Sequence, residues 1–437
     1  MKKQIALSAM AVSLLSSVSV QAADDLSSMF SEGKASGQIR AFYINRDDNT
    51  KADSQIGTAI GGHLKFETAD YKGLSFGSAF YTTNRVLPSL EKDAMGSNTT
   101  LFSNDGSSYS ILGEAYVQYK YENTTFKGGR QKLNTPLAGA DDARMLPNLF
   151  EAYVVSNSDI KNTTLVAAYV TKMAPGTFAN AYNGGIVGAT GGYTAVPGNT
   201  ALYQGQFTDM GDWAIGEDTD GVATVGAIYA NDNFKIQAWD YFAFDILNAI
   251  YLQADVKWKC LLSDSVKPFA AVQFIKEDGL GSYVTKDVDS MYLGAKVGAG
   301  IGGFKAYVAY SQQSDADAGD ELNNATITPW GGMPAFTQGM VTRHMFLPGT
   351  KATKAAATYN FKEHGVNLSA TGYYASFDMD ENSGYGTART AKEPGFDIQY
   401  YPAAVKNLQL RLRGNFPTEF GNDRDWTEYR FIANYTF

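Results

Sequence analysis

Histidine, cysteine and proline are scarce in this chain of 437 residues, which has 3 His, 1 Cys and 12 Pro. Cys260 has no second cysteine to pair with, and three histidines are few for a zinc site. After the first 22 residues, no stretch approaches the ~20 consecutive apolar residues of a membrane-spanning helix. Basic residues are outnumbered 36 to 45 by acidic ones, so a formal charge of −9 gives no general attraction for nucleic acid. We therefore expect no metal site, no cofactor, no disulfide and no nucleic-acid partner.

The first 22 residues have the pattern of a secretory signal peptide. Lys2 and Lys3 form a basic start, residues 5–20 are uncharged and mostly apolar or small, and Val20-Gln21-Ala22 offers the small residues that signal peptidase requires. An N-terminal membrane anchor is the alternative, but the apolar segment is rich in Ser and short for a span. We expect cleavage after residue 22 and export of residues 23–437.

Tyrosine, phenylalanine and glycine are abundant, with 27 Tyr, 25 Phe and 44 Gly, a composition that favours strands and tight turns. Polar and apolar side chains alternate along many segments, as in 250–258, where Gln253, Asp255 and Lys257 alternate with apolar residues. Successive side chains of a strand point to opposite faces, so each segment has one apolar and one polar face. We predict eighteen strands, with sixteen also compatible, at 34–46, 55–69, 74–83, 108–121, 124–131, 149–156, 163–171, 221–230, 234–243, 249–259, 268–275, 290–300, 304–311, 352–361, 366–376, 393–400, 408–415 and 426–437.

The connections between these strands alternate between short and long. Every second connection is a tight turn, as at 70–73, 122–123 and 301–303, whereas most of the others are longer, such as 84–107 and 172–220. A soluble β-sandwich would also show alternating strands, but it has no reason to collect its short turns at one rim. Short turns at one rim and long loops at the other are typical of outer-membrane barrels.

The chain ends on an alternating strand whose last residue is Phe437. Tyr429, Phe431, Ala433 and Tyr435 lie on the same face of that strand as the terminal residue. A last strand that ends in an aromatic residue resembles the signal read by the outer-membrane barrel assembly machinery. We therefore expect that machinery to be a partner.

These patterns predict a single domain, residues 23–437, in the bacterial outer membrane: all-β, a transmembrane antiparallel up-and-down β-barrel. Lipid offers no hydrogen bonds to backbone groups, so a sheet in a membrane must close on itself. We expect the outer face to contact the lipid bilayer and lipopolysaccharide, with aromatic side chains at the interfaces. About eighteen strands leave a lumen too wide for side chains to fill, so the barrel should hold a water-filled channel.

Several short motifs in this sequence are similar to those of a known family. They are Gly129-Arg130-Gln131, Asn134-Thr135-Pro136, Arg144-Met145-Leu146-Pro147 with Phe150-Glu151, Thr342-Arg343-His344-Met345-Phe346 and Tyr373-Tyr374-Ala375-Ser376-Phe377-Asp378. From the signal peptide to its last residue, the chain resembles the OprD-type substrate-specific porins and the related major porins of epsilon-proteobacteria. The resemblance implies eighteen strands and a third loop, here 132–148, that folds inward as the constriction. The charged residues expected at this constriction are Arg130, Asp141, Asp142 and Arg144.

The resemblance also implies a basic ladder, a row of cationic side chains on one inner wall that guides a substrate carboxylate. The alternation predicts such a row independently on the polar faces of the first two and last two strands, namely Arg40, Lys65, Arg411, Arg413 and Arg430. These strands become neighbours when the barrel closes, and Asp141 and Asp142 on the inward loop would then create a transverse field across the lumen. The alternative is that these cations pair with neighbours such as Glu67, Asp397 or Glu428 and merely keep the pore wet.

We therefore predict a porin, a channel for passive diffusion of small hydrophilic solutes and ions, favouring carboxylates or amino-acid-like solutes and without enzymatic activity. An outer-membrane barrel enzyme is one alternative; it would need His63 or His344 beside a nucleophile or second catalytic group, and no local pattern supports this. A barrel that serves adhesion or surface structure is the other, and it would conduct little or nothing. A homotrimer and a monomer are both compatible with the sequence.

Overall fold

The computed structural model describes residues 23–86, 98–103, 105–182, 205–281, 288–315, 317, 324–332, 334–420 and 424–437. The predicted signal peptide, residues 1–22, lies outside the described residues. No helix in the described part of the chain is long and apolar enough to cross a membrane.

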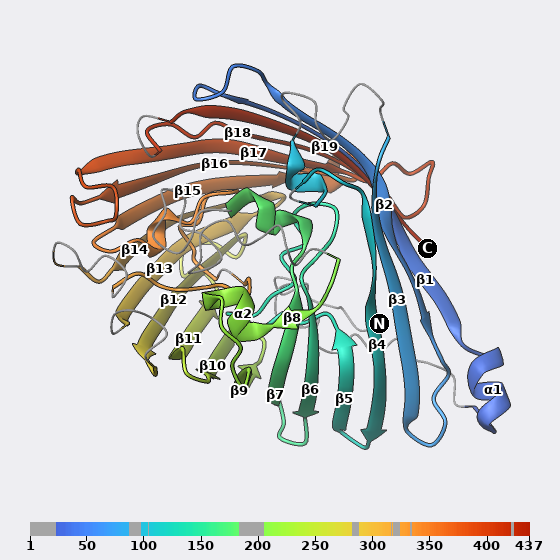
Figure 1. Cartoon of the computed structure of the whole chain (residues 1–437). Coiled ribbons are helices and arrows are strands. Elements are labelled where there is room, and N and C mark those ends of the chain that lie inside the picture. The colour runs from blue at the N-terminus through green and yellow to red at the C-terminus, as the bar shows by residue number, and fades with distance from the viewer. Residues whose placement is uncertain are drawn as a thin grey trace.

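Eighteen described strands form the wall of one closed barrel (Figure 1). They are β1 (Lys34–Asp48), β2 (Gln55–Glu67), β3 (Leu74–Arg85), β4 (Tyr109–Tyr121), β5 (Thr124–Gln131), β6 (Leu149–Asn157), β7 (Thr163–Ala174), β9 (Val222–Ala230), β10 (Phe234–Ala243), β11 (Leu247–Lys257), β12 (Val266–Gly279), β13 (Asp289–Ile301), β14 (Phe304–Gln313), β15 (Lys351–Asn360), β16 (Leu368–Met379), β17 (Arg389–Tyr400), β18 (Leu408–Asn415) and β19 (Trp426–Thr436). The remaining elements are short and lie before β1 or in the connections: α1 (Leu26–Ser31), η3 (Thr99–Leu101), η4 (Thr177–Tyr182), β8 (Thr208–Asp209), α2 (Met210–Ile215), η6 (His344–Phe346) and η7 (Phe361–His364).

Each wall strand pairs antiparallel with its neighbours, and β1 pairs with β19 to close the barrel. At the seam, Gly37 and Phe437 exchange two backbone hydrogen bonds of 3.0 and 3.1 Å. The prediction of eighteen antiparallel strands is confirmed, and most strand ends differ from the predicted ends by only a few residues. The largest differences occur where a strand continues past the apolar belt, as in β12, which runs to Gly279 rather than residue 275. Polar residues at the rim keep pairing there, although they no longer give an apolar face.

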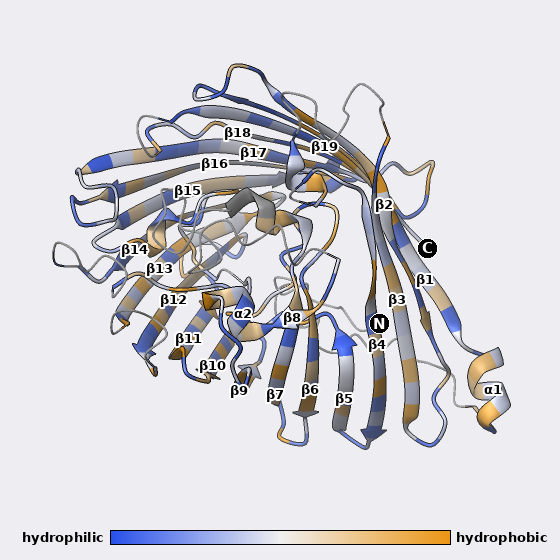
Figure 2. Ribbon diagram, viewed as in Figure 1, coloured by the Kyte–Doolittle hydropathy of each residue, from blue (hydrophilic) through white to orange (hydrophobic). Residues whose placement is uncertain are grey.

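The two faces of the wall differ as the alternation predicts. Large apolar side chains are exposed on the outside, for example Leu64, Val272 and Val308, which are 56–57% exposed in the isolated chain. Figure 2 shows the resulting alternation of hydrophobic and hydrophilic residues along the strands. Lipid covers such an outer face in a membrane, and removal of apolar surface from water stabilises the barrel there.

The short connections lie at one rim and the long ones at the other. Two-residue turns such as 122–123 and 302–303 belong to the first rim, which faces the periplasm in outer-membrane barrels. Several long connections from the other rim run inside the barrel instead of standing away from it (Figure 1). The buried apolar cluster is therefore found where these loops pack on the inner wall, around Trp213, Tyr241 and Trp330.

Close packing between β1 and β2 depends on glycine at residues 37 and 62. Gly62 has a φ of +124°, which L side chains rarely adopt, and a Cβ at this position would collide with the carbonyl of Gln38. The two strands that carry Arg40 and Lys65 therefore approach each other closely because residues 37 and 62 have no side chain.

Candidate functional site

The loop 132–148 crosses the lumen between opposite walls. At one end, the carboxylate of Asp142 accepts a hydrogen bond of 2.6 Å from Nη1 of Arg40 on β1, and the same guanidinium donates to the carbonyl of Arg144. At the other, the backbone N–H of Leu137 donates to the hydroxyl of Tyr241 on β10 at 3.3 Å. Strands β1 and β10 lie on opposite sides of the barrel, so this loop spans the channel (Figure 1).

Asp142 is held ionised by its partner. Burial by itself would raise the pKa of this carboxyl, but the guanidinium of Arg40 holds the pKa below its ordinary value. The ion pair therefore persists at neutral pH and fastens the loop to β1.

A second pair of charges fastens the same loop to β19. Glu428 lies 3.0 Å from Nη2 of Arg144 in the loop and 3.1 Å from Nε of Arg430 on its own strand. The three side chains are at most 2% exposed. A carboxylate between two guanidinium groups compensates part of the large cost of burying these charges.

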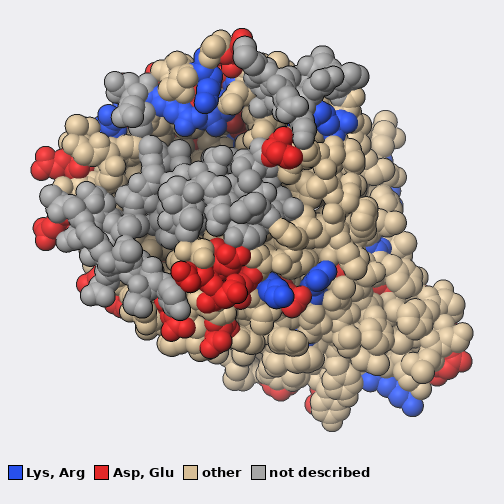
Figure 3. Space-filling view, viewed as in Figure 1, with Lys and Arg blue, Asp and Glu red and all other residues tan. Residues whose placement is uncertain are grey.

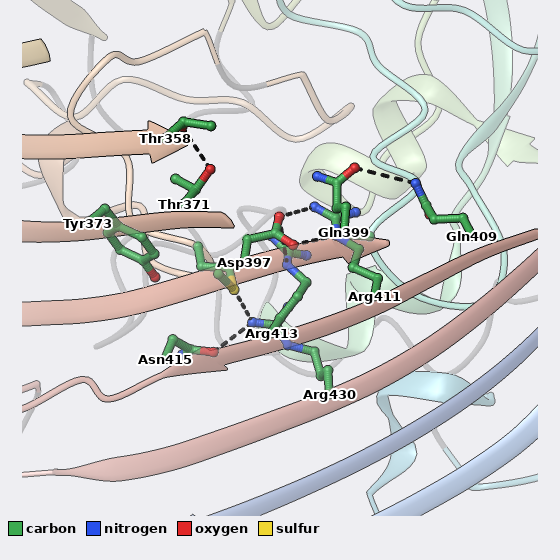
Figure 4. A network of polar contacts seen from close by, with 12 residues as sticks. Thr358, Thr371, Tyr373, Asp397, Gln399, Gln409, Arg411, Arg413, Asn415 and Arg430 are labelled. Carbon is green, nitrogen blue, oxygen red and sulfur yellow. Dashed lines mark hydrogen bonds and ion pairs between the residues drawn. The ribbon is translucent and has the colours of Figure 1, made fainter. Parts of the chain in front are cut away.

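Asp397 on β17 holds the two predicted cations of β18. It forms an ion pair with Arg411 and lies 3.6 Å from Nε of Arg413 (Figure 4). Arg413 in turn stands directly opposite Arg430 in the register of β18 and β19. Figure 4 shows the three arginines on adjacent strands around this single aspartate.

We call Arg144, Arg411, Arg413 and Arg430 the arginine cluster. Among the described residues, its four guanidinium groups form ion pairs with two carboxylates, those of Asp397 and Glu428, so these six groups together carry more positive than negative charge. Nη1 of Arg430 is buried and has no hydrogen-bond partner among the described residues, while Nη2 donates to Asn415 at 2.6 Å.

Two predicted cations lie apart from both Arg40 and this cluster. Lys65 points to the inner face between Glu67 and Glu114, 3.3 and 3.2 Å away. Arg130 lies near the end of β5, on the face opposite to Lys127 and Gln131, where it pairs with Glu151 at 3.4 Å. The structure thus gathers Arg40, Asp142 and the arginine cluster, but Arg130 does not join them.

Each predicted ladder residue has an acidic partner. Glu67, Asp397 and Glu428, the partners that the alternative interpretation proposed, contact Lys65, the two arginines of β18 and Arg430, respectively. These pairs fix the cations in place. The described arginine cluster has fewer carboxylates than guanidinium groups. Its arginines are therefore paired, as the alternative proposed, and this wall still keeps a positive potential, as the ladder requires.

A second inward segment, which the sequence analysis did not anticipate, lies across the inner wall. Residues 334–343, here called the inner strap, run at the level of β12 to β17. The strap contacts five strands or loops through the following pairs: Phe336 N–H to Gln273 (3.1 Å), Thr337 to Ser311 (2.6 Å), Gln338 C=O to Lys354 (2.6 Å), Met340 N–H and Thr342 to Glu393 (2.6 and 2.5 Å), and Arg343 to Asp141 (3.1 Å). Its only signal in the sequence was the motif that includes Thr342 and Arg343.

The strap and the loop 132–148 are joined inside the barrel. Asp141 pairs with Arg343 at 3.1 Å and also accepts from the backbone N–H of Gly332 at 3.2 Å. The N–H of Gly139 donates to the carbonyl of Trp330 at 3.1 Å. Asp141 therefore connects two loops, whereas its neighbour Asp142 connects the first loop to the wall.

Charges of opposite sign gather at different places around the mouth. In the space-filling view, Lys and Arg side chains gather over β16 to β18, while Asp and Glu side chains gather near α2 (Figure 3). A separation of this kind sets up a field across an aqueous opening.

The two histidines that an enzyme would require pack against aromatic rings. His63 stacks on Tyr81 with ring centroids 5.0 Å apart, and the ring of His344 lies 4.5 Å from that of Phe420. Among the described residues, no group of three His, Cys, Asp or Glu side chains is placed to hold a metal ion.

The family model of the outer membrane porins of the OprD family matches residues 28–437. The chain belongs to this family. This OprD-family porin is accordingly an outer-membrane channel protein, as the sequence analysis predicted. No curated protein matches its sequence.

Solved structures with the same fold share little sequence with this porin. The structure of OpdK from Pseudomonas aeruginosa with vanillate has a TM-score of 0.71 at 16% identity, covering 94% of this chain and 99% of that one. A BenF-like porin from Pseudomonas fluorescens Pf-5 gives 0.71 at 17% identity with the same coverage. OccK2 (OpdF) from Pseudomonas aeruginosa, in complex with glucuronate, gives 0.69 at 16% identity, again covering 94% and 99%.

Proposed function

We propose that this porin passes small hydrophilic solutes and ions by passive diffusion and favours solutes that carry a carboxylate. The observation that carries the proposal is the arginine cluster, in which four guanidinium groups share two carboxylates. Arg413 and Arg430 stand opposite each other, so their positive charges add on this part of the wall and attract an anion in the lumen. A planar guanidinium also holds a carboxylate through two hydrogen bonds.

The solved relatives support this choice of solute. OpdK was crystallised with vanillate and OccK2 with glucuronate, and both compounds carry a carboxylate. We propose the same chemical class for this porin, with Arg40 and the arginine cluster as the basic ladder. Lys65 was also predicted for the ladder. It lies between two carboxylates, so less positive charge remains around it than around the arginines.

We further propose that the loop 132–148 forms the constriction together with the inner strap. The two segments are joined through Asp141 and Arg343, and the loop contacts opposite walls. Asp141 and Asp142 are both engaged by guanidinium groups, so we assign them the anchoring of the loop rather than a free negative pole. Arg130, which pairs with Glu151 on β6, has no place in this proposed constriction.

The proposal includes the partners predicted for this porin in the membrane: lipid, lipopolysaccharide, the barrel assembly machinery and further copies of the chain. The outer face and rim contact lipid and lipopolysaccharide, and Phe437 presents the terminal strand to the barrel assembly machinery. A homotrimer and a monomer both stay compatible with the wall described above. The predicted cleavage after residue 22 precedes assembly.

Single-channel recording in a planar bilayer under a KCl gradient tests this function. We expect open channels from the wild type, and we expect Arg411→Ala/Arg413→Ala to shift the reversal potential toward cation selectivity and to weaken block by carboxylates. If the double substitution changes neither the reversal potential nor the block by carboxylates, the protein is a general porin and the basic ladder is rejected. Folded, heat-modifiable protein without any conductance would instead favour a role in adhesion or surface structure.

A further inference from the structure

An open, mostly apolar hollow of about 670 Å³ lies in the outer face of the wall at β13 to β16. Val297, Val308 and Tyr374, which border it, are 45–57% exposed and point away from the lumen. Directly opposed residues of antiparallel strands share a face, so Ala355, the partner of both Val308 and Tyr374, points outward as well. The hollow is therefore open to the lipid phase.

The hollow exists because the side chains of the next outward row are small. Ala306, Ala357 and Gly372 are register partners on β14, β15 and β16. A Cβ at Gly372 would meet no atom within 4 Å, so the space above this residue is open. On β10, by contrast, the outer face carries Phe234 and Ile236, which are 47% and 49% exposed. At β14 to β16, lipid therefore has to fill space that protein side chains fill on other strands.

Two exposed lysines stand on the same outer face, between the hollow and the rim of the long loops. Lys392 on β17 is two residues from Pro394, the register partner of Tyr374. Lys351, at the start of β15, is four residues from Ala355. At about 3.3 Å per residue, the two lysines lie about 7 and about 13 Å along the strands from the row that borders the hollow.

These two lysines differ from another lysine on the same rim in their counter-charges. Lys276 on β12 is paired with Asp278 at 2.6 Å and with Asp289 at 2.5 Å. Within the described part of the chain, neither Lys351 nor Lys392 forms an ion pair. Their ammonium groups are therefore available to an anionic group from the membrane.

The polar groups between the two lysines suit a phosphate. Asp378 is the single acidic side chain in the outward rows that contain the lysines, and it accepts a hydrogen bond from Thr390 at 3.1 Å. The hydroxyl groups of Thr353 and Ser376 lie in the same row as Lys392. Two ammonium groups against one carboxylate leave an excess of positive charge, and hydroxyl groups can donate hydrogen bonds to phosphate oxygens.

The order of these features along the wall matches a lipid of the outer leaflet. The short turns face the periplasm, so the lysines near the opposite rim lie toward the cell surface and the hollow lies deeper in the membrane. In lipid A, the membrane anchor of lipopolysaccharide, phosphate groups stand above several acyl chains. A flexible acyl chain can follow the shape of a hollow, whereas a second copy of the barrel would need a complementary ridge.

We propose that Lys351, Lys392 and the hollow below them form a binding site for lipid A. A phosphate group lies between the two ammonium groups, and an acyl chain fills the space beside Ala306, Ala357 and Gly372. Charge attracts the headgroup, as it does for basic side chains next to other membrane spans, and the buried chain adds contact with the apolar wall. This inference rests on the proposed contact with lipopolysaccharide, gives it a place on the wall, and does not depend on which solute passes the channel.

Native mass spectrometry of the folded, detergent-solubilised barrel with added lipid A tests the headgroup site. The test variant is Lys351→Gln/Lys392→Gln. The matched control is Lys172→Gln/Lys276→Gln, which removes two outward lysines of the same rim away from the hollow. We expect the lipid A concentration for half-saturation to rise at least about tenfold in the test variant and less than about twofold in the control.

A second pair of variants tests the hollow. Ala306→Leu/Ala357→Leu fills it from two directly opposed outward residues. Ala227→Leu/Ala238→Leu makes the same change in two directly opposed outward residues of β9 and β10. We expect the half-saturating concentration of lipid A to rise about threefold in the first variant and to stay near the wild-type value in the second.

The outcomes separate this site from the proposed function. Equal weakening in the test and control variants would indicate a diffuse contact with lipid and overturn the site. Phosphatidylglycerol that binds as tightly as lipid A and responds to the same variants would overturn the assignment to lipid A. Bound copies of the chain without lipid would show an interface between barrels instead. If lipid A fails to bind the wild type, the site is rejected, while single-channel conductance still tests the porin function. Each variant is accepted only when it is heat-modifiable and forms open channels.

Discussion

Glu428 is the carboxylate on which two buried arginines depend. It lies 3.0 Å from Arg144 and 3.1 Å from Arg430, and its side chain is 2% exposed. Glu428→Gln preserves the shape of the side chain but leaves both guanidinium groups without that charge. Breaking a buried pair in this way costs roughly 3–5 kcal/mol, so we expect a clear loss of stability. The measurement is the temperature at which the folded, faster-migrating band converts to the unfolded band on gel electrophoresis.

A second carboxylate provides the control for Glu428. Glu363 lies exposed in the turn η7, and surface charges of this kind contribute little to stability. Glu363→Gln should therefore convert at the wild-type temperature. Equal shifts for both variants would contradict the role assigned to Glu428.

The ion pair between Arg40 and Asp142 gives the loop 132–148 a defined dependence on pH. The pKa of Asp142 is lower in the folded protein than in the unfolded chain, so the pair contributes stability above the unfolded pKa. That contribution is lost as the pH falls through the folded pKa, which lies below the ordinary pKa of an aspartate. We expect the noise of the open channel to stay constant near neutral pH and to increase only in acid, once the pH is below the ordinary pKa of an aspartate.

Asp142→Asn tests the same anchor at neutral pH. The amide cannot form the ion pair, so this variant should show the increased noise of the open channel at pH values where the wild type is quiet. A wild-type channel that stays quiet in acid, or a variant as quiet as the wild type, would show that the loop is held without Asp142.

If the inner strap forms part of the constriction as proposed, it narrows the channel as an element, independently of any one of its side chains. It lies across β12 to β17 and is held by hydrogen bonds to Gln273, Lys354 and Glu393. Replacing residues 334–341 with a short Gly-Ser linker removes this layer but leaves the wall strands intact, and loops tolerate such changes better than strands do. We expect the single-channel conductance to increase by roughly twofold because the open cross-section grows.

The control for the strap is a replacement of similar kind at the other rim. The turn 258–265 joins β11 and β12 at the short-turn end and should tolerate a Gly-Ser linker at residues 261–264 without a change in conductance. Unchanged conductance after removal of the strap would assign the constriction to the loop 132–148 alone.

The closed barrel brings the first and last strands together. Phe437 exchanges two backbone hydrogen bonds with Gly37, while its side chain is 50% exposed on the outer face. Deleting Phe437 removes little buried surface, so refolding into detergent should proceed as in the wild type. If the assembly machinery reads this residue, however, the amount of folded barrel in the outer membrane of cells should fall several-fold. Heat-modifiable protein in membrane fractions measures this amount.

Tyr435 offers the matched control because it is an exposed aromatic residue on the same face of β19. Tyr435→Ser should leave assembly in cells close to that of the wild type. An equal loss in both variants would indicate that the last strand needs apolar surface in general, without a special role for the final residue.

The amino-acid sequence by itself determined the barrel, because each of its signals is local. Alternation of side chains with a period of two reports a strand with two different faces, and the turn lengths report which rim a connection belongs to. β10, from Phe234 to Ala243, has the same ends in the prediction and in the structure. The inward faces of Arg411, Arg413 and Arg430 followed from the same alternation. The same alternation places Lys296 and Lys354 on the inner face of β13 and β15.

The tertiary structure alone decided which charges meet. Arg40 and Asp142 are 102 residues apart in the chain, and Arg144 and Glu428 are 284 apart. The alternation of side chains indicates that the residues on the strands face the lumen. It does not indicate their position along the barrel axis or which loop contacts them. The inner strap shows the same limit, since nothing in its local sequence distinguishes a loop that lies against the wall from one that extends into solvent. Contacts of this kind depend on strand register and barrel closure, which are properties of the whole folded chain.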